Sequence, residues 1–185
     1  MAKKKSAGKK PIERVPRKEK YTADRLRNLV ERLREQSMAM ANQGNDKRGK
    51  GFAEEAAKRK DKASERERMY IDAMDAWFKA DANKKKERME AFIKSFERIL
   101  YQFPDDVEAK SFLALHLWKG ESDGVRIQSH LSVDALLDQV FAANPMHPAH
   151  HYRIHLWDGQ RPIKALGSAA LGGQSGPGIA HLWHM

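Results

Sequence analysis

Residues 89–109 read MEAFIKSFERILYQFPDDVEA, and this stretch decides the fold class. Its large apolar side chains recur three and four positions apart, the spacing that gathers them on one face of an α-helix: Met89, Phe92, Ile93, Phe96, Ile99, Leu100 and Phe103. Pro104 ends this helix because proline has no backbone N–H to donate. Asp105 is the predicted cap of a following helix, with Glu108 three residues later. The stretch therefore predicts two helices joined by a tight turn.

The same helical period continues downstream of this pair. A loop is expected over residues 120–130, followed by a helix capped by Ser132 that ends near Pro145. Another helix is expected from Pro148 to about residue 157, since proline is tolerated in the first turn. A short helix over 162–171, a Gly-rich turn and an apolar fragment over 179–185 complete the chain.

Upstream, Ser64 and Glu67 have the spacing of a capping box and predict the start of a further helix. Two more helices are expected before it, over about 22–41 and 50–62. No segment shows the apolar alternation of a strand. The sequence thus predicts an all-α fold of antiparallel helical hairpins, with eight side chains in the core: Trp77, Phe92, Phe96, Leu100, Phe112, Leu113, Leu137 and Phe141.

Composition divides the chain into three parts: a basic arm over residues 1–20, N-terminal helices over 21–63 and a helical repeat region over 64–185. The arm is rich in Lys and Arg and almost free of large apolar side chains, so we expect it to be disordered. Residues 1–68 carry 22 Lys and Arg against 11 Asp and Glu, whereas the remainder carries 13 against 14. One hypothesis is therefore a nucleic-acid accessory protein, or nonspecific polyanion binding, through residues 1–68.

Two parts of the repeat region are similar to each other: Pro104 and Pro145 end their helices in similar contexts, 41 residues apart, and the apolar residues before them match at equal offsets. Three further fragments are distinctive: ERERMYIDA (65–73), FPDDVEA (103–109) and HPAHHY (147–152). Through these features the region resembles the tetratricopeptide-repeat family of bacterial proteins. The resemblance implies a short α-solenoid that binds a protein or peptide partner on its concave face, as a scaffold without catalytic activity or cofactor. Because the chain ends inside an apolar segment, we expect a C-terminally truncated member of a longer array.

Histidines supply a second functional hypothesis. His147, His151 and His155 are four residues apart, which places them along one face of the helix predicted after Pro148. Imidazoles with this spacing can bind zinc, copper or nickel, as a metal-binding protein or a metal-dependent enzyme would require. The alternative is that they cap helix ends and form hydrogen bonds between packed helices.

Other features of the sequence restrict the chemistry and the cellular location that we expect. The chain has no cysteine, which excludes disulfides and thiolate metal ligands. No apolar run approaches the roughly 20 residues of a membrane span, and no apolar segment follows the basic N-terminus as in a signal peptide. We therefore expect a cytoplasmic protein.

Overall fold

The computed structural model describes residues 23–42 and 44–184, and within these ranges the chain is all-helical, without a strand. The fold class predicted from the sequence is thus confirmed. The disordered arm predicted over residues 1–20 lies outside the described residues. The α-helices are α1 (Ala23–Asn42), α2 (Asp46–Ala57), α3 (Glu65–Lys79), α4 (Lys85–Gln102), α5 (Val107–Lys119), α6 (His130–Ala143), α7 (His150–Trp157) and α8 (Leu166–Ser175).

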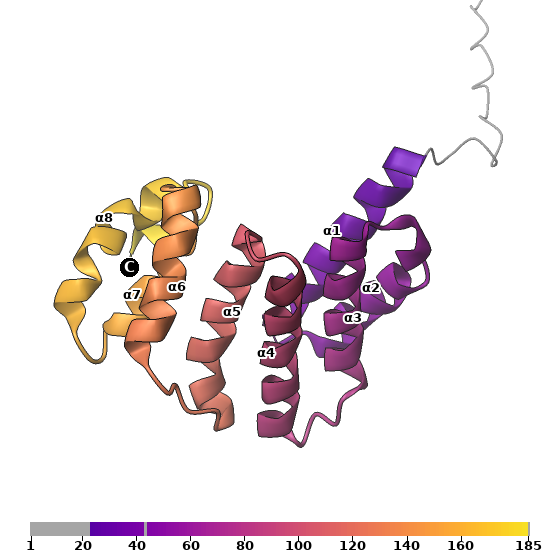
Figure 1. Ribbon diagram of the computed structural model, residues 1–185, viewed down its shortest axis with the longest axis horizontal. Coiled ribbons are helices and arrows are strands. Elements are labelled where there is room, and N and C mark those ends of the chain that lie inside the picture. Colours follow the sequence, from indigo (N-terminus) through magenta and orange to yellow (C-terminus); the bar gives the residue numbers. More distant parts are fainter. Residues whose placement is uncertain (1–22, 43, 185) are drawn as a thin grey trace, which may run out of the picture.

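Consecutive helices pack against one another along the chain. Each α-helix from α1 to α7 contacts the next one, and further contacts join α1 to α3 and α5 to α7. In Figure 1 the helices lie side by side, with α1 to α3 at one end of the molecule and α6 to α8 at the other. Within the described residues, four short 3₁₀ helices lie between or after them: η2 (Lys60–Lys62), η3 (Gly120–Asp123), η4 (Pro162–Lys164) and η5 (Ala180–Trp183).

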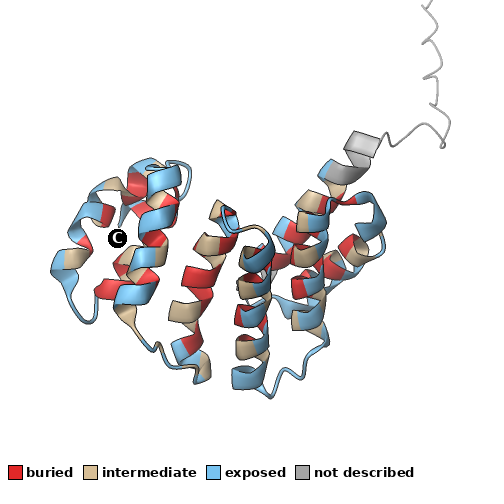
Figure 2. Ribbon diagram, in the orientation of Figure 1, coloured by how far each residue is buried: buried red, intermediate tan, exposed pale blue. Residues whose placement is uncertain are grey.

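Helix α5 lies between two apolar clusters. Phe92, Phe96 and Leu113 belong to the cluster that α5 forms with α3, α4 and parts of α1 and α2, while Leu137 belongs to the cluster that α5 forms with α6 and α7. Because α5 has neighbours on both sides, it is apolar around most of its circumference rather than along one stripe. Figure 2 shows that its buried residues outnumber the exposed ones along its length.

The eight predicted core residues divide evenly by burial. Phe92, Phe96, Leu113 and Leu137 are buried. The other four are partly buried and pack against the two clusters: Trp77, Leu100, Phe112 and Phe141.

Helix caps show where local sequence signals were sufficient and where they were not. Ser64 caps α3 as predicted, with its Oγ accepting the Glu67 N–H at 3.2 Å. The predicted cap Asp105 was wrong, because the carboxylate of Asp106 accepts the Ala109 N–H instead. Ser132 was also wrong as a cap: Ser129 caps α6, and its Oγ accepts the N–H of Ser132.

The Gly-rich turn predicted after residue 171 starts later than expected, since α8 continues through Gly172 and Gly173 to Ser175 and the turn lies at 176–178. The reason is close packing of η5 against α8. A Cβ added at Gly173 would lie 2.5 Å from Cε3 of Trp183, and one at Gly172 would lie 3.4 Å from the carbonyl oxygen of Leu182. The lack of a side chain at these two glycines allows close contact between helices rather than a turn. This contact holds η5 beside α7 and α8.

Candidate functional sites

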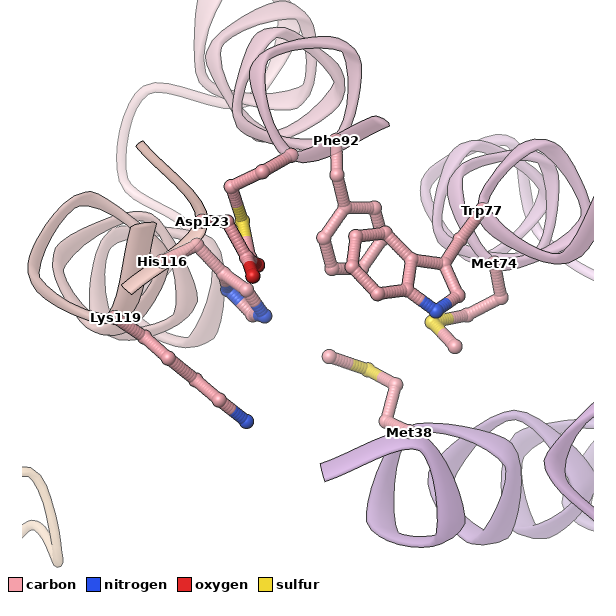
Figure 3. A pocket seen from close by; sticks show the side chains of 8 residues that line it. Met38, Met74, Trp77, Phe92, His116, Lys119 and Asp123 are labelled. Atoms are coloured by element: carbon pink, nitrogen blue, oxygen red, sulfur yellow. The ribbon is translucent and has the colours of Figure 1, made fainter. Parts of the chain in front are cut away.

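A pocket of about 170 Å³ lies where α1, α3, α4 and α5 meet (Figure 3). We call it the Trp77 pocket. Its volume is below the roughly 300–1,000 Å³ of sites for drug-sized molecules, so it suits one side chain better than a whole small ligand. Eight residues line it: Met38, Met74, Trp77, Met89, Phe92, His116, Lys119 and Asp123.

The walls of this pocket are apolar and deformable. Met38 reaches in from α1 opposite the aromatic rings of Trp77 and Phe92, and Met74 lines the pocket from the same helix as Trp77 (Figure 3). Methionine side chains are unbranched and polarisable, so they adapt to partners of different shape. Lys119 and Asp123 add one charge of each sign to the lining.

Trp77 presents a polar group inside this apolar lining. Its Nε1 is buried, and none of the described residues provides a hydrogen-bond partner for it. The ring is held by Phe92, at 4.8 Å between centroids, and by the guanidinium of Arg88, 3.8 Å from the ring centroid. Arg88 also donates from Nε to the carbonyl oxygen of Trp77 at 2.9 Å. An unpaired buried N–H costs about 1–3 kcal/mol, so an acceptor supplied from outside would be bound favourably.

His116 contributes a neutral imidazole to the same pocket. It is buried between Phe92 and Phe96, at 4.7 and 5.4 Å between ring centroids. Burial lowers the pKa of His116 to about 4, the hydrogen bond with the Phe112 carbonyl opposes this shift, and Lys119 adds slightly to it. In the neutral ring Nδ1 carries the hydrogen and donates to that carbonyl at 2.7 Å, which leaves Nε2 as an acceptor.

This buried imidazole predicts a loss of stability in mild acid. The unfolded chain binds the proton near pH 6.5 and the folded chain only near pH 4, so acidification through this window favours unfolding. The shift corresponds to about 3 kcal/mol of unfolding free energy, present at pH 7 and lost by pH 4. Urea unfolding at both pH values should show this loss in the wild type and a smaller one in His116→Gln. Parallel pH dependence of the two proteins would contradict the assignment.

A second candidate site, which we call the His cluster, consists of His151, His155 and His181. One potential metal-ligand atom from each of them lies within 4.8 Å of the others, the one such group of three among the described residues. His151 and His155 lie one turn apart on α7, and His181 comes from η5. Their ring centroids are separated by 4.7 Å for His151 and His155 and by 4.8 Å for His151 and His181.

Neighbouring groups fix the rings of this cluster. Nδ1 of His155 lies 3.1 Å from a carboxylate oxygen of Asp158, and its ring stacks on Trp118 at 4.8 Å with an interplanar angle of 5°. Nδ1 of His181 lies 3.1 Å from Nε2 of His184. Burial, together with the nearby His155 and His181, lowers the pKa of His151 to about 4. His151 is therefore a neutral imidazole at pH 7.

His147, which the sequence grouped with His151 and His155, lies elsewhere. Its Nδ1 accepts the Ala149 N–H at 3.1 Å and its Nε2 lies 3.3 Å from a carboxylate oxygen of Glu108. The predicted three-residue set is thus replaced by one that contains His181. The reason is that His147 precedes α7, so the helical spacing that aligns His151 with His155 does not extend to it.

Within residues 1–68, most of the described Lys and Arg side chains form ion pairs with carboxylates of the same chain. Lys58 and Arg59 both contact Glu55, and Lys60 lies 2.6 Å from Asp72. In these pairs the positively charged side chains contact carboxylates of the protein itself. The prediction of polyanion binding by residues 1–68 therefore depends mainly on the segment before Ala23, outside the described residues.

Met38 and His181 are among the residues of these sites that the predicted core and metal-ligand sets did not contain. Met38 lies within the helix predicted over about 22–41, yet only the packing of α1 on α3 shows that it closes a pocket. His181 and His184 have a three-residue spacing within an apolar segment, which was a usable signal. Their approach to α7 depends on the close packing at Gly172 and Gly173.

Comparisons with known proteins identify no relative: no family model, no curated protein and no solved structure matches the chain. None of the described helices is long and apolar enough to cross a bilayer.

Proposed function

We infer that this chain is a protein-interaction module of tetratricopeptide-like type, which binds a segment of a partner protein through the Trp77 pocket. The observation that carries this proposal is the buried, unpartnered N–H of Trp77 in a methionine-lined pocket at the junction of four helices. The sequential packing of helices supports it, because stacked hairpins of this kind form grooves between neighbouring units. The resemblance of residues 65–73, 103–109 and 147–152 to tetratricopeptide repeats agrees with it.

The chemistry of the lining defines the bound segment. An apolar side chain, such as leucine or methionine, would replace water against Met38, Met74 and Phe92. A carbonyl of the same segment would accept the Trp77 N–H, and a backbone N–H would reach the acceptor nitrogen of His116. Partner binding thus needs one apolar anchor side chain with peptide groups beside it. It involves no chemical reaction of either protein.

The proposal can be tested with peptides selected on the wild-type chain from a random display library. Trp77→Phe removes the unpaired N–H but keeps an aromatic ring, and we expect it to weaken peptide binding by about tenfold, the equivalent of one hydrogen bond. Trp183→Phe is the matched control, since Trp183 is 61% exposed and belongs to η5, outside the pocket lining. Fluorescence anisotropy of labelled peptides measures both affinities.

Equal weakening by the two variants would contradict the proposal, as would selected peptides without an apolar anchor. Met38→Trp provides a second arm, because it fills the pocket and should abolish binding while helicity is retained. Circular dichroism of each variant separates loss of binding from loss of folding.

A further inference from the structure

Three observations on the His cluster lead to a ligand. The imidazoles of His151, His155 and His181 come from two separate segments, and a potential ligand atom of each lies within 4.8 Å of the other two. Nε2 of His151 is buried, and none of the described residues bonds to it. This nitrogen would be satisfied by a group that lies between the three rings, where no other side chain supplies a donor.

The other two rings also keep Nε2 available. Nδ1 of His155 is engaged by Asp158, and Nδ1 of His181 is engaged by His184. A metal-binding histidine usually donates a hydrogen bond from its other ring nitrogen to a carboxylate or another polar group. This hydrogen bond fixes the tautomer and the ring orientation. Trp118 stacks on His155 and restricts the ring further.

We propose that His151, His155 and His181 bind one divalent transition-metal ion through their Nε2 atoms, with Zn²⁺ as the principal candidate. Three imidazoles without a coordinating carboxylate suit zinc, copper or nickel, and do not suit Ca²⁺ or Mg²⁺, which bind through oxygen. Three protein ligands also leave a fourth tetrahedral position, for water or another donor.

Binding requires a small closure of the rings. In a tetrahedral zinc site with Zn–N bonds of about 2.0–2.1 Å, neighbouring ligand nitrogens lie roughly 3.3 Å apart. One potential ligand atom from each ring lies within 4.8 Å of the others, so these atoms need to approach by at most roughly 1.5 Å, within reach of side-chain rotation and a shift of η5. His181 is exposed and lies in a 3₁₀ helix of four residues, whereas α7 is packed in the second apolar cluster. We expect the metal to order η5 against α7.

The test uses the full chain, purified without a histidine tag and dialysed against a chelator. Isothermal titration with ZnCl₂ should show one Zn²⁺ per chain, and elemental analysis after desalting should recover it. His151→Gln and His181→Gln should each weaken binding by more than about 100-fold, while Asp158→Ala, which removes the support of His155, should weaken it about 10- to 100-fold. His130→Gln is the matched control, because His130 lies outside the cluster on α6, and its affinity should equal that of the wild type.

Thermal unfolding with and without Zn²⁺ provides a second readout, because a ligand that binds only the native state raises Tm. The wild type and His130→Gln should gain Tm, and the two cluster variants should not. If His151→Gln folds poorly, His181→Gln still decides the outcome, since His181 is exposed. Absence of stoichiometric Zn²⁺, Cu²⁺ or Ni²⁺ in the folded wild type would overturn the proposal, and so would unchanged affinity in His181→Gln. The Trp77 pocket shares no lining residue with this site, so peptide binding is tested independently.

Discussion

Replacing Phe96 with alanine is expected to lower the free energy of unfolding by about 3–5 kcal/mol, the usual cost of truncating a buried phenylalanine. Phe96 is 1% exposed and joins three helices. Its ring centroid lies 6.0 Å from that of Tyr70 on α3, 5.1 Å from that of Phe92 on α4 and 5.7 Å from that of Phe112 on α5. Truncation removes these contacts and leaves a cavity that the surrounding helices only partly fill.

Urea unfolding followed by circular dichroism measures this loss. Tyr101→Ala is the control, because Tyr101 lies on the same helix and is 82% exposed. Its unfolding free energy should stay within about 0.5 kcal/mol of the wild type. A comparable loss in both variants would mean that α4 does not bury the face that contains Phe96.

The second large effect is expected for Asp106→Ala, at about 3 kcal/mol of unfolding free energy. The carboxylate of Asp106 accepts a hydrogen bond from the Ala109 N–H in the first turn of α5. It also accepts two hydrogen bonds from Arg66, at 2.6 and 2.8 Å, and one from the Tyr70 hydroxyl at 3.1 Å. Loss of a helix cap costs about 1 kcal/mol, and the unsatisfied buried hydroxyl of Tyr70 adds about 1–3 kcal/mol.

The protonation state of Asp106 agrees with this role. Burial raises the pKa of its carboxyl, but hydrogen bonds from Arg66 and from the Ala109 amide lower it more, so the pKa lies below its usual range. The carboxylate is therefore ionised whenever the protein is folded near neutral pH. Asp105→Ala is the matched control, since Asp105 is adjacent and exposed. Chemical unfolding should separate the two variants by more than about 2 kcal/mol, and equal stability would contradict the assigned cap.

Local periodicity was sufficient to predict the helices. The spacing of Met89, Phe92 and Phe96 predicted a helix up to Pro104, and α4 spans Lys85–Gln102. The cap of α5 could not be chosen in this way, because two aspartates are adjacent and both fit the local rule. Asp106 is the cap in the structure, where Arg66, 40 residues earlier in the chain, also binds it. That preference depends on α3, which supplies the Arg66 and Tyr70 side chains that donate to the Asp106 carboxylate.

Both candidate sites show the same limit of prediction from the sequence. The four-residue spacing of His151 and His155 predicted two neighbouring imidazoles, and the third comes from η5, which approaches α7 only after the chain has turned through α8. The Trp77 pocket requires Met38 from α1, 39 residues before Trp77 in the sequence. Sequence patterns identify residues on one face of one helix, and sites between helices depend on how those faces meet.

The most direct test of the proposed partner-binding site is a nuclear magnetic resonance titration of the ¹⁵N-labelled chain with a selected peptide. The chain has four tryptophans, so four indole N–H signals are expected, each assigned by a Trp→Phe variant. We predict that the Trp77 signal moves on peptide addition, as its N–H gains an acceptor, while the signal of exposed Trp183 stays in place. A bound peptide that leaves the Trp77 signal unmoved would contradict the proposed site.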